Sequence, residues 1–140
     1  MQNKTHIGTY GIIKKGDQVL LIKKARGPYK GMFDLPGGSL EHGEDIAEAL
    51  IREINEETGL EASKVEWDSN LTTTVDFRDK RGDISMYHIG LIYKVTKFSG
   101  KIISEMSEED SLGAEWFKIT DLHKESLSPF AKLAVNNSQP

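Results

Sequence analysis

The sequence predicts an α+β or mixed α/β domain in which helices pack on a β-sheet. Two pairs of segments rich in β-branched and aromatic residues are typical of β-hairpins, and a segment between them repeats its apolar residues at helical spacing. The length of 140 residues is usual for one globular domain, so we expect a single domain over residues 1–140.

The first hairpin is expected near the N-terminus, followed by a long loop. Residues 5–23 contain two apolar stretches, THIGTYGIIK and QVLLIKK, separated by the turn-like tripeptide Lys15-Gly16-Asp17. The next segment, ARGPYKGMFDLPGGSLEHGED, holds glycine and proline too densely for a regular element to continue. We therefore predict a long loop there, and long ordered loops often carry function.

A helix is expected from about Glu44 to Thr58. Its apolar residues recur at three- and four-residue spacing and form one stripe: Ala47, Leu50, Ile51 and Ile54. Gly59 stands where a helix that ends in a left-handed residue favours glycine, so the helix has a marked end.

The second hairpin is expected from residues 71–79 and 85–96, which flank the polar segment 80–83, and we expect much of Ile89 to Val95 to be buried. After the acidic segment SEMSEEDS, the sequence AEWF predicts a short strand. ITDLHK and SPFAKLAV then predict two short helices, the second starting at Ser128 and Pro129. The last residues, NNSQP, are expected to fray.

Composition and charge exclude several classes of protein. The net charge of −4 provides no basic field for a large nucleic acid, and the absence of cysteine leaves oxygen and imidazole as metal ligands. No segment is apolar for the length of a membrane span, and the N-terminus lacks a secretory pattern, so we expect a cytoplasmic protein with no membrane partner. The D-x-D-x-D-G loop of calcium-binding proteins is absent.

Three glutamates crowd one side of the predicted helix. Glu53, Glu56 and Glu57 fall within an arc of roughly 100° on a helical wheel, on a different face from the apolar stripe. Arg52, four residues before Glu56, offsets part of their repulsion. One interpretation is a solvated acidic face, since glutamate is a common helix former. The other is a site for Mg²⁺, which prefers carboxylate oxygens together with water and substrate phosphate.

The loop in front of the helix favours the metal site. From Gly38 to Leu60 the sequence follows the pattern G-x5-E-x7-R-E-U-x-E-E-x-G-U, where U is apolar. This segment resembles the signature of the Nudix hydrolase family, which includes the MutT-like proteins, at every fixed position. The upstream GMFDLPGG, the two hairpins and the AEWF strand are also similar to the family, so the resemblance extends over the whole chain.

The resemblance implies the Nudix fold, a mixed β-sheet sandwiched between α-helices. It also implies a hydrolase that uses Mg²⁺ or Mn²⁺ and water to cleave the diphosphate linkage of a small molecule, a nucleoside diphosphate joined to another group. Glu53, Glu56 and Glu57 would hold the metal, with the backbone carbonyl of Gly37 as a further ligand. Arg52 would orient these carboxylates, and Glu44 would brace the loop against the helix.

For the general base the resemblance leaves two alternatives. We favour Glu53. The other source is an acid of the downstream acidic segment, namely Glu105, Glu108 or Glu109.

Further residues could contact a substrate, although surface cations are commonly solvated and strand aromatics are commonly core. The basic candidates near the glycine-rich loop and the hairpin tip are Lys23, Arg26, Lys30, Arg78, Lys80 and Arg81. The aromatic candidates for stacking on a base are Phe33, Phe77, Tyr87 and Trp116. We treat His88 as structural or substrate-lining rather than as a metal ligand.

The identity of the substrate is less defined than the reaction. The proline of many ADP-ribose hydrolases is missing around Val75, and the tyrosine typical of dinucleoside polyphosphate hydrolases is missing at Phe77 and Arg78. A nucleoside triphosphate or a nucleotide sugar is therefore favoured. A Nudix domain that only binds a nucleotide, as a sensor or regulatory module, is the alternative, but such domains usually lose carboxylates that this chain retains. Many relatives are dimers, which leaves a homodimer open.

Overall fold

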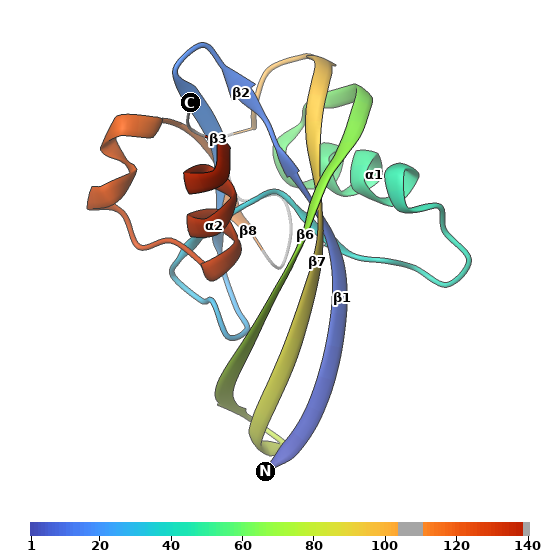
Figure 1. Cartoon of the computed structure of the whole chain (residues 1–140), viewed down its shortest axis with the longest axis vertical. Helices are drawn as coiled ribbons and strands as arrows, with labels where there is room; N and C mark the ends of the chain where they lie inside the picture. Colours follow the sequence, from blue (N-terminus) through green and yellow to red (C-terminus); the bar gives the residue numbers. More distant parts are fainter. Residues whose placement is uncertain (104–110, 139–140) are drawn as a thin grey trace.

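The computed structural model describes residues 1–103 and 111–138 and contains two β-sheets with helices around them (Figure 1). The strands are β1 (Gln2–Ile12), β2 (Lys14–Lys15), β3 (Gln18–Lys24), β4 (Phe33–Asp34), β5 (Gly37–Ser39), β6 (Glu61–Asp79), β7 (Gly82–Ser99) and β8 (Ser111–Lys118). The helices are α1 (Ile46–Thr58), the 3₁₀ helix η1 (Ile119–Lys124) and α2 (Pro129–Ser138). No helix in the described part of the chain is long and apolar enough to cross a membrane.

The first sheet is mixed and has the strand order β5-β1-β7-β6. β1 runs parallel to β7, whereas β6 and β7 form the predicted second hairpin and run antiparallel. Both hairpin strands are longer than predicted, and the turn between them is reduced to Lys80 and Arg81. Together with β1 they extend from the body of the domain as a long three-stranded ribbon with the N-terminus at its tip (Figure 1).

The first hairpin is smaller than predicted, because β1 is not part of it. β1 pairs with β7 and β5, and only Lys14 and Lys15 from the first apolar stretch pair with β3. The fully buried Ile13 lies where the chain passes from the first sheet to the second, which contains β2, β3, β4 and β8. The prediction was wrong because alternating apolar residues indicate a strand but do not identify its partner.

The segment 25–45, predicted as one long loop, contains the two short strands β4 and β5. β4 pairs with β3 and β5 pairs with β1, so the segment is attached to both sheets. Gly37, the first residue of β5, has a φ of 144°, and a side chain there would collide with the carbonyl oxygen of Thr9. Part of the glycine density that predicted an irregular loop therefore reflects a close approach between strands.

Helix α1 lies almost where it was predicted. Asp45 caps its first turn by accepting a hydrogen bond from a backbone N–H (3.1 Å), so the helix begins just after the predicted Glu44. Gly59 ends it in the left-handed conformation, with a φ of 83°. Leu50 and Ile54 are fully buried, as the apolar stripe predicted.

Helix α2 begins at Pro129, as predicted. The Oγ of Ser128 accepts a hydrogen bond from the backbone N–H of Ala131 (3.2 Å) and donates one to Asp34 (2.5 Å). The other predicted short helix, ITDLHK, is the 3₁₀ helix η1. The prediction of a frayed tail is wrong for residues 136–138, which continue α2; the last two residues lie outside the described part.

The two α-helices cover opposite faces of the first sheet. Leu50 and Ile54 of α1 lie close to Gly11 of β1, whereas Phe130 of α2 packs against Gly90 of β7. Each helix closes one apolar cluster; the first includes Ile13, Leu20, Leu50 and Ile54, and the second includes Tyr10, Leu21, Ile92 and Phe130. The predicted α/β architecture, a mixed sheet sandwiched between helices, is therefore confirmed.

Candidate active site

The last turn of α1 packs against the short strand β5 through a buried carboxyl group. Glu57 is only 4% exposed, and its Oε1 accepts a hydrogen bond from the backbone N–H of Gly37 (2.7 Å). The expectation that all three glutamates lie away from the buried face is thus wrong for Glu57, because β5 folds over that side of the helix. Burial raises the pKa of Glu57 to about 8, although its bond to Gly37 acts in the opposite direction.

Arg52 joins the other carboxylates of the predicted site. Its Nε and Nη2 donate to the two oxygens of Glu44 (2.8 and 3.0 Å), an arrangement that ties the loop to the helix. Its Nη1 lies 3.2 Å from Glu53 and 3.3 Å from Glu56. The Arg52 guanidinium holds the pKa of the Glu44 carboxyl below its usual value. One cation therefore offsets part of the charge of three glutamates.

Two consecutive glycines bring the backbone of β5 against these carboxylates. A Cβ atom at Gly38 would lie 2.9 Å from Oε2 of Glu53, and one at Gly37 would meet β1. Glycine at position 38 therefore lets the backbone of β5 approach the Glu53 carboxylate, and glycine at position 37 lets it approach β1.

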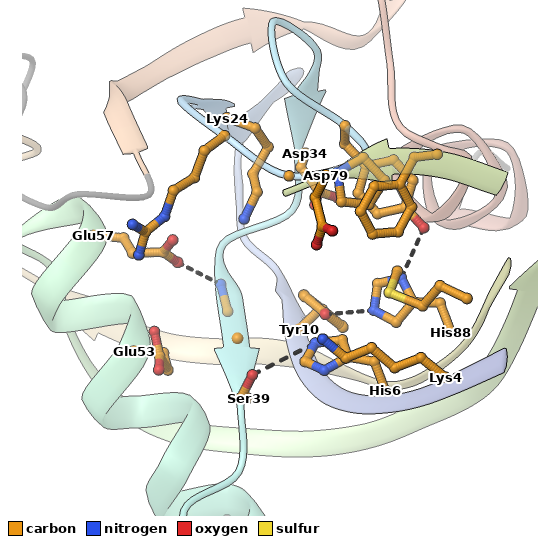
Figure 2. Close-up of a pocket in the computed structure, with 18 of the residues that line it drawn as sticks. Lys4, His6, Tyr10, Lys24, Asp34, Ser39, Glu53, Glu57, Asp79 and His88 are labelled. Atoms are coloured by element: carbon orange, nitrogen blue, oxygen red, sulfur yellow. Dashed lines mark hydrogen bonds between the residues drawn. The ribbon is translucent and has the colours of Figure 1, made fainter. Parts of the chain in front are cut away.

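A cavity of about 1080 Å³ opens beside this edge, with walls from both sheets and from α1 (Figure 2). Glu53 and Glu57 lie on one side of it. The tip of the β6–β7 hairpin contributes Phe77, Asp79, Lys80 and Arg81 to the lining, and β1 and β7 contribute Lys4, His6, Tyr10, Met86 and His88. The carboxylate edge thus belongs to a larger space with both acidic and basic walls.

The basic residues singled out from the sequence are divided by the fold. Arg26, Lys80 and Arg81 line the cavity. The Nζ of Lys23 instead lies 5.9 Å from the centre of the Phe33 ring. Its neighbour Lys24 lines the cavity, because adjacent residues of a strand point to opposite faces. Two more candidates, Lys30 and Arg78, are not part of the lining.

Lys24 was not predicted, and it lines the cavity near several titratable groups. Burial is the largest influence on these groups, since it raises the pKa of Glu57 and Asp34 and lowers that of His6 and His88; the charge of Lys24 is a smaller cause that lowers all four pKa values. The only sequence signal for it was its place at the end of a strand directly before the glycine-rich segment.

Most of the aromatic candidates lie elsewhere. Phe77 lines the cavity, but Phe33 packs edge-on against Phe117 with ring centres 4.7 Å apart, and Trp116 packs beside Phe98. Tyr87 is 45% exposed on the opposite face of the sheet from His88. Phe33 and Trp116 are therefore partly buried and pack against the core, in partial agreement with the expectation that strand aromatics are commonly core.

His88 lies deep in the cavity wall, in agreement with its expected lining role. Its Nε2 is 2.7 Å from the hydroxyl of Tyr10, and its Nδ1 is 2.8 Å from the hydroxyl of Tyr29 (Figure 2). Burial, with the nearby charge of His6 and Lys24 as smaller causes, lowers the pKa of His88 to about 3, so the ring is neutral at physiological pH. Neither tyrosine was predicted, because their convergence on His88 depends on long-range pairing.

Asp34 is a second buried polar residue that the sequence analysis missed. It is 2% exposed and lines the cavity, and its Oδ1 accepts hydrogen bonds from Ser128 and from the backbone N–H of Leu35 (2.8 Å). Burial raises the pKa of its carboxyl group. The expected alternative bases Glu105, Glu108 and Glu109 lie outside the described residues.

The predicted metal ligands fit a hard divalent cation by their chemistry, although they are not gathered around a common point. Among residues 1–103 and 111–138, no three histidine, aspartate or glutamate side chains are grouped closely enough to hold an ion. Glu57 bonds to Gly37, and Glu53 and Glu56 lie against Arg52. However, a buried carboxyl group whose pKa is raised is a feature that a cation would stabilise in its charged form.

Comparison with known proteins agrees with this geometry. Residues 4–136 match the family model described as the NUDIX domain. The chain is 39% identical over 114 residues to an ADP-ribose pyrophosphatase of Methanocaldococcus jannaschii, with 81% of this chain and 62% of that protein covered. It is 34% identical over 112 residues to the human 8-oxo-dGDP phosphatase NUDT18, with 79% and 31% covered. The chain thus spans less than two thirds of the length of either relative.

A solved structure agrees over almost the whole chain. The MutT NUDIX hydrolase of Burkholderia pseudomallei superimposes with a TM-score of 0.76 at 26% identity, with 97% of this chain and 99% of that chain covered. Since the matched family model spans far more than half of the residues, and since the carboxylates, Arg52 and the glycines occupy the positions of the family signature, the chain belongs to the Nudix family.

Proposed function

We propose that this protein is a divalent-cation-dependent hydrolase that cleaves the diphosphate linkage of a nucleoside diphosphate joined to another group. The observation that carries the proposal is the position of Glu53 and Glu57 on the wall of a cavity that also presents Lys24 and Arg26. A diphosphate needs positive charge around it, and its hydrolysis needs a group that can take a proton from water. Both kinds of group face the same space.

Glu53, Glu56 and Glu57, with the backbone carbonyl of Gly37, are the proposed ligands of Mg²⁺ or Mn²⁺. When bound, such an ion neutralises phosphate charge and makes a bound water more acidic. The protein contributes the placement of the ligands: Arg52 fixes Glu53 and Glu56, and the N–H of Gly37 fixes Glu57. Glu44 holds Arg52 from the loop side and so keeps the carboxylates in place.

Glu53 is the proposed general base. Its carboxyl group lines the cavity, where an attacking water would reach it, and Arg52 orients it through a contact of 3.2 Å with Oε1. Lys24 would interact with substrate phosphate, because it is the lysine of β3 that faces the cavity and because its charge already acts on Glu57 and Asp34.

The candidate substrates come from the sequence, from the two relatives and from the volume of the cavity. The sequence favours a nucleoside triphosphate or a nucleotide sugar, and the two relatives add ADP-ribose and oxidised guanine nucleotides as candidates. A cavity of about 1080 Å³ lies at the upper end of the usual range for small-molecule sites, so it has room for a substrate with groups on both sides of its diphosphate.

The test is product analysis on a panel of ADP-ribose, a nucleotide sugar, dGTP, 8-oxo-dGTP and 8-oxo-dGDP, with Mg²⁺, with Mn²⁺ and with chelator. We expect cation-dependent cleavage between phosphates for at least one member. Glu57→Gln should keep the wild-type circular dichroism spectrum and lose most of this activity, whereas Glu48→Gln, in the first turn of the same helix, should keep it. Tight nucleotide binding without turnover of any member would favour the alternative of a nucleotide-binding sensor.

A further inference from the structure

The carboxyl group of Asp34 has one oxygen that is hydrogen-bonded twice and one that is not hydrogen-bonded. Its Oδ1 accepts hydrogen bonds from the hydroxyl of Ser128 (2.5 Å) and from the backbone N–H of Leu35 (2.8 Å). No hydrogen bond or ion pair within the described part of the chain reaches the other oxygen, Oδ2. Because a buried polar atom without a partner is costly, this oxygen is a candidate acceptor for a ligand.

The unbonded oxygen opens into the cavity. Asp34 is only 2% exposed, and it belongs to the lining of the cavity. Among residues 1–103 and 111–138, Oγ1 of Thr9 is the only side-chain polar atom that is both sealed from solvent and without a hydrogen bond. Oδ2 of Asp34 is therefore not sealed, and a donor in the cavity can reach it.

The carboxyl group is held in one orientation, and its charge is only partly compensated. Ser128 precedes α2, and its Oγ accepts a hydrogen bond from the N–H of Ala131, so its own hydrogen is directed to Asp34. Burial raises the pKa of Asp34, whereas the bond from Ser128, the charge of Lys24 and the bond from Leu35 lower it. A further donor at Oδ2 would complete this compensation.

The charges around Asp34 indicate that the donor is neutral. Lys24 and Arg26 line the same cavity and already provide positive charge there. A cationic group of a ligand would be repelled by these two side chains. A neutral N–H or O–H group can bond to the carboxylate without this repulsion.

The surroundings of Asp34 suit a planar ring. After burial, the charge of Asp34 is the next cause that raises the pKa of Tyr10 and of Tyr29, so Asp34 lies near the place where these two hydroxyls meet His88. Phe77 also lines the cavity. Aromatic side chains with a few polar groups are the usual lining of a small-molecule site. A neutral donor on a planar ring is an N–H group of a nucleobase.

We propose that Oδ2 of Asp34 accepts a hydrogen bond from the exocyclic amino group of a nucleobase, so that the protein selects substrates whose base is adenine, guanine or cytosine. The amino group is favoured over the ring N–H of uracil or hypoxanthine, because the carbonyl oxygen beside that N–H would be repelled by the carboxylate. Asp34 is then a specificity-determining residue, and Ser128 positions it.

The distance between Asp34 and the carboxylate edge is compatible with one nucleoside. Asp34 lies three residues before Gly37, so their Cα atoms are at most roughly 11 Å apart. A diphosphate at the carboxylate edge can therefore place the base of the same nucleotide beside Asp34. For the rest of the substrate the inference rests on the proposed function.

The first experiment compares nucleotides that differ at the amino group. Wild type is assayed on matched pairs of the substrate class that the panel identifies: adenine with hypoxanthine, guanine with hypoxanthine, and cytosine with uracil. We expect kcat/KM to be at least about tenfold higher for the amino member of the preferred pair, as for one hydrogen bond to a charged group. Equal values, or a higher value for the member without the amino group, overturn the inference while the proposed function stands.

A binding measurement separates the two proposals if the panel gives no turnover. Calorimetry in chelator compares AMP with IMP, GMP with IMP, and CMP with UMP. Without turnover the proposed function fails, and tighter binding of an amino member still supports the inference. Equal affinity within every pair, or no binding of any of these nucleotides, overturns it.

The second experiment changes the acceptor into a donor. Asp34→Asn keeps an oxygen for Ser128 and Leu35 and places an NH₂ group where Oδ2 stands. We expect this variant to lose the preference for the amino member and, in the adenine–hypoxanthine and cytosine–uracil pairs, to prefer the carbonyl member. Asp121→Asn, at an exposed acid of η1 outside the cavity lining, is the matched control and should keep the wild-type preference. An unchanged preference in Asp34→Asn overturns the inference; if this variant does not fold, the wild-type comparison decides it.

Discussion

The neutral state of His88 has a measurable effect on the pH dependence of stability. The proposed change is His88→Gln, which keeps a polar side chain of similar length but removes the titrating group. In the folded protein His88 is 3% exposed and its pKa is lowered to about 3, whereas in the unfolded chain it returns to about 6.5. The unfolded state therefore binds one more proton than the folded state between these two values.

The sign and the size of the change in folding free energy with pH follow from this difference in bound protons. A lowered folded pKa stabilises the protein fully above pH 6.5, and this stabilisation is lost as the pH falls toward 3. From pH 6.5 to pH 5 the shift corresponds to about 2 kcal/mol at about 1.4 kcal/mol per pH unit. Because one side of the ring faces the cavity and water can moderate the shift, we expect wild type to lose about 1–2 kcal/mol more than His88→Gln between pH 7 and pH 5.

The comparison with His88→Gln is essential, because the free energy of unfolding of wild type alone can stay constant with pH. Glu57 has a raised pKa, about 8, so its contribution is present at low pH and is lost as the pH rises through 8, opposite to that of His88. Wild type and His88→Gln share this effect of Glu57.

Urea unfolding in chelator at pH 7, 6 and 5, followed by circular dichroism, gives the free energy of unfolding of each protein. If the two free energies fall in parallel, His88 is not held neutral by the fold. The control is a substitution of an exposed histidine, His123→Gln.

Three further predictions concern the carboxylate edge. Millimolar Mg²⁺ at low salt should raise the melting temperature of wild type measured by calorimetry, and it should raise that of Glu57→Gln less; no shift in wild type would argue against a preformed ion site. Gly37→Ala should lower the free energy of unfolding by at least about 2 kcal/mol, because of its φ of 144° and the collision with Thr9. Gly43→Ala should cost less, because Gly43 also has a positive φ, 79°, but a side chain there would meet open space. Glu44→Gln should reduce kcat of the identified substrate with a smaller change in stability, since it loosens Arg52; unchanged kcat would mean that the loop does not position the carboxylates.

Local signals in the sequence were sufficient for the helix and for one hairpin. The helix followed from its apolar stripe and from Gly59, and both are consequences of neighbours within a few residues. The β6–β7 hairpin followed from two β-rich segments joined by a short polar turn. β1 was assigned to the wrong partner because its parallel ladder with β7 joins residues more than 70 positions apart, for which periodicity carries no information.

Contacts between residues far apart in the sequence also form the cavity, and local patterns do not predict them. The family signature located Glu53, Glu56 and Glu57, because their spacing is set by one helix. The opposite wall brings Tyr10, Tyr29 and His88 together from three separate segments. No local pattern specifies such a convergence, so the carboxylate edge of the cavity could be predicted from the sequence and the wall that holds these three residues could not.

The burial of Glu57 connects these two levels. A helical wheel places Glu57 beside Glu53 and away from the apolar stripe, but β5, held by Gly37 against β1, closes over it. The same glycine that allows the strand to approach thus supplies the N–H that bonds the carboxyl group and removes the water that would have stabilised its charge. Because burial disfavours the charged form of Glu57, it destabilises the folded protein near neutral pH. A cation at the site would stabilise the charged form and reverse that effect. Stability is therefore lowered at Glu57, one of the residues that the proposed function assigns to an ion.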